Sequence, residues 1–352
     1  MLFVMIRRPK SSLSRHATIS GAASAVPMAV APAWLRRAVP DAQSLAGKDV
    51  GLNALGPNAL EEIAIAAGAA IGALDAVVRR QERWADAWRQ RLALAAAAVT
   101  ARQAGRIEDE NALRDAVLLT RPGDNVGPAG SLFLGWRRLA GAPAAKLLTE
   151  ASIAVVLDEF GFAHDDEVVN DLVEELRQLA ASDGTVGMMT GAIAIAERHG
   201  FARALGAWLA DALLAQRLGW TFAVPLLGAE AALGTSARSR RAAASSVAIR
   251  IETDPERAKG LLAAQARAAL RAVDLSAELG RRADRLLAVA PKLRARAADA
   301  VVERLLSADA IVASEKIAGM SDRGLRRLFD RLVELGAVRE LSGRPTFRIY
   351  GL

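Results

Sequence analysis

The chain has 352 residues, of which 52% are hydrophobic and 24% charged; this is enough apolar content for a large packed core and excludes a globally disordered protein. It contains no cysteine, which excludes disulfides, thiolate catalysis and cysteine-ligated zinc. From residue 235 onward, 23 Lys and Arg stand against 14 Asp and Glu, so the net charge of +7 belongs wholly to the C-terminal third. A basic end on a near-neutral body is typical of a nucleic-acid-binding protein with a scaffold, and a solvated basic surface is the alternative.

Residues 1–55 show no sustained helical period and are predicted to form a disordered tail. Four basic residues precede an uncharged run over residues 17–35, an order that superficially resembles a signal peptide. However, Gly21, Pro27 and Pro32 interrupt this run, which is too weakly apolar to span a membrane. We therefore expect a soluble, cytoplasmic protein with no membrane association.

Residues 56–233 have the sequence pattern of a helical bundle. Apolar residues recur at helical spacing, and Gly, Pro and Asp separate the segments. Aromatic residues make up only 4%, so alanine and leucine must build the core. No stretch before residue 336 alternates convincingly as a strand. Helices are predicted over residues 58–77, 84–104, 109–119, 130–139, 147–160, 166–181, 188–198 and 201–218.

A linker is predicted over residues 234–253 and a long connecting helix over residues 254–290. Asp254 supplies an N-cap acceptor and Pro255 suits the first helical position. Gly260 and Gly280 weaken the pattern, which leaves two shorter helices open. The stripe of small apolar residues along this long helix would pack against the body of the chain or form the contact of a dimer.

Residues 291–352 are predicted to form a winged helix-turn-helix. The pattern predicts a helix over residues 297–306, a short helix through residues 316–318 capped by Ser314, and a basic helix that begins after Ser321 and ends at Gly336. The period then switches to two, which predicts strands over residues 337–341 and 346–350 joined by a turn. The predicted fold is therefore an all-α multi-helix bundle with a small C-terminal winged helix-turn-helix containing one short β-hairpin.

The basic helix is the candidate recognition helix, because an α-helix fits the major groove and arginine can donate two hydrogen bonds to guanine. Arginines on the hairpin would meet phosphate. Double-stranded DNA is therefore the expected partner, while a protein-interaction module with solvated arginines is the alternative. A homodimer or a partner protein bound through the helical body also stays open. The candidate DNA-binding residues are Ser321, Arg323, Arg326, Arg327, Arg331, Arg344 and Arg348.

Residues 325–352, with the runs LGAVREL and RIY, resemble the C-terminal winged helices appended to Fic-type bacterial proteins. The larger chain resembles the bacterial domain-of-unknown-function family number 1403, through residues 73–98, residues 108–130 and the helical region after Leu172. The second resemblance implies an architecture and no activity. The first suggests a toxin-antitoxin or similar partner, although the histidine motif and glycine-rich loop of Fic catalysis are absent.

Four patterns in the sequence are candidates for an enzyme or ligand site. His164 with the acidic residues after it suggests a metal cluster, but a loop and an acidic helix N-terminus explain it better. His199 reads as a residue at a helix end, and residues 121–128 read as a structural turn rather than an anion loop. The cluster of Arg79, Arg80, Arg83, Trp84, Trp88, Arg89 and Arg91 could stack on single-stranded bases, but core packing is favoured. We expect a protein that is not an enzyme and has no metal or cofactor.

Overall fold

The computed structural model describes residues 31–40, 59–121, 123–182, 184–230, 255–293, 295, 297–342 and 346–352. Most of the described residues lie in helices, and a small three-stranded sheet stands near the C-terminus, so the all-α prediction is confirmed. The predicted linker over residues 234–253 and residues 1–30 and 41–55 of the predicted tail lie outside the described residues.

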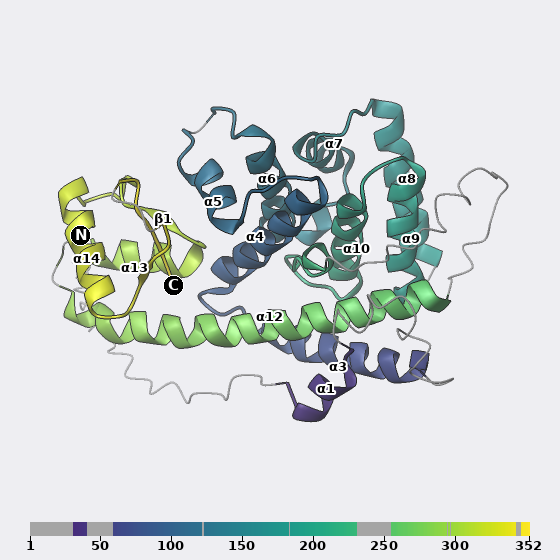
Figure 1. Cartoon of the computed structure of the whole chain (residues 1–352), viewed down its shortest axis with the longest axis horizontal. Coiled ribbons are helices and arrows are strands. Elements are labelled where there is room, and N and C mark those ends of the chain that lie inside the picture. The colour runs from purple at the N-terminus through teal and green to yellow at the C-terminus, as the bar shows by residue number, and fades with distance from the viewer. Residues whose placement is uncertain are drawn as a thin grey trace, which may run out of the picture.

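Helix α12 (Pro255–Val289) runs beneath almost the whole molecule (Figure 1). It is one continuous helix, so neither Gly260 nor Gly280 divides it. The body of the protein packs on one side of it, and α1 and α3 on the other (Figure 1). Its apolar stripe is therefore used within the chain, with Leu262 and Val273 buried against the body and α3.

Within the described residues 85–230, seven α-helices form the body. Helix α4 is buried on nearly every side, which its alanine-rich sequence allows because short side chains let neighbouring helices approach closely. Helices α9 and α10 pack as an antiparallel pair around Gly200, whose φ of +76° favours glycine. The helices are α4 (Ala85–Gln103), α5 (Glu110–Leu118), α6 (Gly127–Gly141), α7 (Glu150–Glu159), α8 (Asp166–Ser182), α9 (Thr185–Arg198) and α10 (Arg203–Arg217), with short 3-10 turns at η2 (Ala144–Lys146), η3 (Leu227–Ala229) and η4 (Ala290–Lys292).

Part of the predicted tail is ordered, which corrects the prediction for residues 33–38. These residues form α1 (Ala33–Ala38), which packs against α3 (Ala59–Arg79). Leu35 is only 1% exposed, and Arg36 donates a 2.7 Å hydrogen bond to Asp274 of α12. A helix of six residues is too short to produce a recognisable period, and its position is fixed by contacts with residues far along the chain.

The C-terminal module, residues 297–352, contains α13 (Ala298–Ser307), β1 (Ile311–Val312), α14 (Asp322–Glu334), β2 (Arg339–Glu340) and β3 (Ile349–Gly351). The sheet order is β1-β3-β2, with both pairings antiparallel. Leu341 N–H donates to Ile349 O, which continues the β2–β3 pairing by one bond.

Three predictions for this module are wrong. Residues 311–312 form a strand, although no strand was expected before residue 336. Residues 313–320 contain turns and no helix, because pairing of Ile311 and Val312 with β3 holds the chain extended just before them. Residues 346–348 precede β3 instead of belonging to it.

A candidate nucleic-acid interface on the C-terminal module

Helix α14 has one buried face and one exposed face. Leu325, Leu328, Phe329 and Leu332 are each at most 5% exposed. Phe329 stacks on Tyr350 of β3, with ring centroids 4.2 Å apart, which anchors the helix to the sheet. Because residues three and four apart share a helix face, this packing turns the remaining positions outward.

Three of the predicted DNA-binding residues lie free on the outward face. Arg323, Arg326 and Arg327 are exposed and make no ion pair with any residue that the structure describes. All three stand in the first half of α14. The first half also carries Asp322, and the second half carries Asp330, Arg331 and Glu334, so the net charge is positive in the N-terminal half and negative in the other.

The other predicted site residues are engaged within the chain. Ser321 is the N-cap of α14, and its Oγ accepts a 3.1 Å hydrogen bond from the Gly324 N–H. Arg331 donates to Glu334 at 2.6 Å. Arg348 lies 3.6 Å from the carboxylate of Asp330 and 3.7 Å from that of Glu340. Arg344 lies outside the described residues.

One exposed residue of the module was missed by the sequence reasoning. Phe347, just before β3, is 67% exposed with a φ of +54°. The alternating pattern around it placed it inside a strand, where a partner strand would have covered it. Pro345, two residues before it in the sequence, is the signal against a strand at this position.

A buried ion cluster joins the module to the body. Asp309, which precedes β1, is 4% exposed. Its carboxylate accepts hydrogen bonds from Arg91 of α4 and, at 2.7 Å, from Arg114 of α5. Burial by itself raises the pKa of Asp309, but the two guanidiniums outweigh this effect and lower it. The side chain of Gln90 and main-chain groups of Ser307 and Asp309 also bond across this contact.

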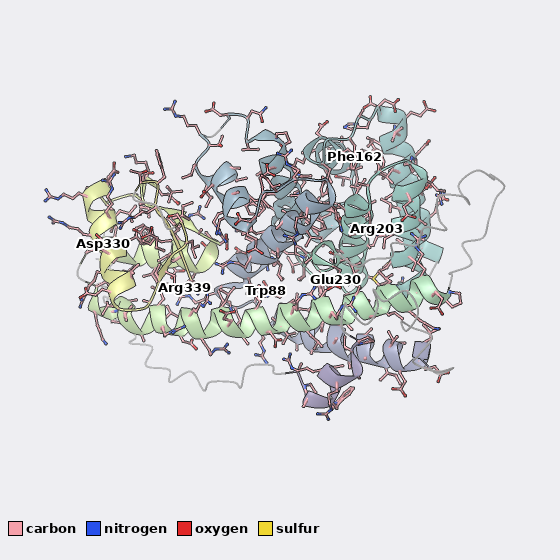
Figure 2. The ribbon with its side chains drawn as sticks, in the orientation of Figure 1. Trp88, Phe162, Arg203, Glu230, Asp330 and Arg339 are labelled. Carbon is pink, nitrogen blue, oxygen red and sulfur yellow. The ribbon has the colours of Figure 1, made fainter. Side chains whose placement is uncertain are left out.

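The tryptophans of the arginine–tryptophan cluster are buried and cannot stack on bases, although Arg79 and Arg83 are exposed. Trp88, labelled between α4 and α12 in Figure 2, is 2% exposed, and its Nε1 donates to Ala272 O at 2.9 Å. Trp84 is also buried. Arg89 is buried too, donates to Ala140 O and lies over the ring of Phe222. This result favours the core-packing alternative.

The two histidine patterns serve local structure. His164 contacts Asp158 at 3.2 Å, and His199 is the C-cap of α9. Among the described residues, no group of His, Asp and Glu is arranged to hold a metal ion. A cavity of about 20 Å³ beside Trp84 and Ser276 has room for a single water molecule.

None of the described helices is both long and apolar enough to cross a membrane. Residues 53–352 match the model of the family described as "Protein of unknown function (DUF1403)". No curated protein and no solved structure matches the chain.

Proposed function

The chain is a member of the DUF1403 family, and we propose that it binds double-stranded DNA through its C-terminal module, with α14 as the recognition helix. The role proposed is that of a regulator or accessory factor, and no step of it is catalytic. The observation that carries the proposal is the set of three exposed, unpaired arginines on a helix whose opposite face is buried.

The position of the arginines fits the geometry of major-groove binding. In helix-turn-helix proteins the N-terminal residues of the recognition helix contact base edges. Arg323, Arg326 and Arg327 occupy that half of α14, while Asp330, labelled in Figure 2, lies farther along the helix. The helix can therefore enter the groove N-terminus first with Asp330 and Glu334 away from the DNA, and Asp322 at its first position is bonded to Lys316.

The topology of the module supports a winged-helix assignment. A helix, a strand, a second helix and a hairpin follow one another, and the first strand pairs with the last. The segment between β1 and α14 lacks the short helix of a complete helix-turn-helix. The likeness of residues 325–352 to winged helices of Fic-type proteins stays a prediction.

The charge of the C-terminal third supports the same partner. Its net charge of +9 suits attraction to phosphate, and the binding it produces weakens as salt rises. The ion cluster at Asp309 joins the module to the body. When the module binds DNA, the body would therefore hold a fixed position relative to the DNA.

The test compares the full chain with Arg326→Ala/Arg327→Ala, using a random-sequence duplex at several salt concentrations. Loss of two phosphate contacts would lower the slope of log affinity against log salt by about two units. If one arginine reads guanine, its loss costs about 1–3 kcal/mol at that base pair in a selected site. Folding should be unchanged, because alanine suits a helix and both side chains are exposed.

The matched control is Arg37→Ala/Arg102→Ala, which removes two exposed arginines from α1 and α4. It changes the net charge equally, so it should leave the salt slope near that of the original chain. Equal affinities and slopes for all three proteins would reject DNA binding through α14 and favour a protein-interaction module. Point substitutions are preferable to deleting residues 291–352, because deletion would leave Arg91 and Arg114 without their buried carboxylate.

A further inference from the structure

Four arginines, called the junction arginines below, meet where the second half of α12 contacts the C-terminal module. Arg281, Arg282 and Arg285 lie within little more than one turn of α12. Because residues three and four apart share a helix face, Arg285 stands on the same side as both of the others. Arg339, labelled close to α12 in Figure 2, comes from β2 and is brought there by the fold.

A hydrogen bond and a strand pairing together place Arg339 next to α12. The Arg282 guanidinium donates to Leu352 O at 3.0 Å. Leu352 follows Gly351, which is the residue opposite Arg339 in the β2–β3 pair. The main chain of Arg339 is therefore close to the carbonyl that Arg282 holds, and the two arginines lie at the same place in the fold.

Three of the junction arginines have no partner. Arg281, Arg285 and Arg339 are exposed, and none of them makes an ion pair or a side-chain hydrogen bond with any residue that the structure describes. Asp284, which is also exposed, stands between the first two on α12. Three free guanidiniums against this one carboxylate leave a positively charged surface.

The fourth junction arginine, Arg282, shows the effect of this crowding. It donates to Glu278 as well as to Leu352 O. Burial lowers the pKa of Arg282 and the nearby positive charge of Arg339 lowers it further, although Glu278 opposes both effects. A bound anion would relieve the repulsion among these guanidiniums, so the surface favours a negatively charged ligand.

We propose that the junction arginines bind phosphate groups of a DNA backbone, as a second contact surface in addition to α14. Guanidinium suits phosphate because its N–H donors pair with two oxygens at once. The row of exposed arginines along α12 is open, which suits a polymer that presents several phosphates, whereas a free phosphate ion is held in a concavity of donors. The inference rests on the proposed function for the identity of its ligand, but not on α14.

The test compares the full chain with Arg285→Gln/Arg339→Gln, using random-sequence duplexes at several salt concentrations. Loss of two phosphate contacts should lower the slope of log affinity against log salt by about two units. Thermal unfolding should be unchanged, because both side chains are exposed and unpaired. The matched control, Arg37→Gln/Arg102→Gln, removes the same charge from α1 and α4 and should keep the original slope.

A parallel titration of Arg326→Ala/Arg327→Ala separates this inference from the proposed role of α14. A lower slope for the junction variant alone would support the junction surface and reject α14 as the recognition helix. A lower slope for the α14 variant alone would overturn the junction surface and leave the proposed function standing. A chain that binds no duplex at any salt concentration would overturn both.

Two further probes identify another ligand if the duplex slope does not change in Arg285→Gln/Arg339→Gln. Inorganic phosphate, at an ionic strength matched with chloride, would then raise the unfolding temperature of the original chain but not of the variant if the surface held a free ion. Polyglutamate bound by the original chain and lost in the variant would assign the surface to an acidic protein. Either result would overturn binding of a DNA backbone.

Discussion

The carboxylate of Asp309 accepts a 2.7 Å hydrogen bond from Arg114, although 195 residues separate them in the chain. Arg91 donates to the other oxygen of the same carboxylate. Two guanidiniums of the body therefore share one buried carboxylate of the C-terminal module. This arrangement ties the C-terminal module to α4 and α5 of the body.

Replacing this carboxylate should destabilise the protein strongly. Asp309→Asn leaves two buried guanidiniums without a counter-charge, and breaking a buried pair in this way costs about 3–5 kcal/mol. Urea unfolding at pH 7 measures the change. Asp322→Asn, which removes an exposed partner of Lys316, is the control and should change the free energy of unfolding little.

The loss of unfolding free energy caused by Asp309→Asn should also become smaller in acid. Because the folded pKa of Asp309 is lowered, its stabilising effect is fully present above the unfolded pKa and is lost as pH falls through the folded value. The two unfolding free energies should therefore converge at low pH. If the difference in unfolding free energy between the two proteins were the same at pH 7 and in strong acid, the charge of Asp309 would not be what stabilises the contact between the module and the body.

A second buried carboxylate has the opposite pH behaviour. Asp211 is 1% exposed and accepts hydrogen bonds from the N–H groups of Leu226 and Leu227, yet burial raises its pKa well above the usual value. Between the unfolded and folded pKa values the native state holds a proton that the unfolded chain has released. Stability from this group is thus present below the unfolded pKa and declines as pH rises through that window. Asp211→Asn should flatten this decline, measured by urea unfolding at several pH values from acidic to neutral. If the unfolding free energy of Asp211→Asn declined with pH as steeply as that of the original chain, the role assigned to Asp211 would be wrong.

Gly228 should tolerate no side chain. A Cβ there would lie 2.2 Å from Cη2 of Trp136, a fully buried ring whose Nε1 is bonded to Thr100. Gly228→Ala should therefore destabilise the fold by about 1–3 kcal/mol through overpacking. Gly260→Ala is the matched control in α12, where nothing lies within 4 Å, and it should stabilise by about 0.5–1 kcal/mol. Thermal unfolding of both variants measures the two stability changes. Equal changes for Gly228→Ala and Gly260→Ala would contradict the prediction.

Arg348 should act on DNA as a general phosphate contact. Arg348→Ala should weaken binding to all sequences alike and lower the salt slope by about one unit. Its position between Asp330 and Glu340 suggests a second variant, Asp330→Asn, which should tighten binding by removing a nearby carboxylate. Titrations with random-sequence duplexes measure both effects. A change confined to one DNA sequence would assign Arg348 to base reading instead.

Much of the local structure could be predicted from the sequence because helical period and caps are properties of neighbouring residues. The basic helix between Ser321 and Gly336 is an example: its N-cap, its buried leucine face and its outward arginines all depend on spacing within one element. The long helix after Asp254 is another, since Pro255 marks its start and Pro291 its end.

Only the tertiary structure decided which charged side chains are free to bind another molecule and which are paired within the chain. Arg91 and Arg326 look alike in the sequence, yet one is bound to buried Asp309 and the other faces outward. The strand at Ile311 and the helix at Ala33 are equally invisible locally, because each is stabilised by a partner far along the chain. Spacing determines which side of an element is apolar, but the free energy that orders a short element or pairs a buried charge comes from contacts made only after the chain has folded.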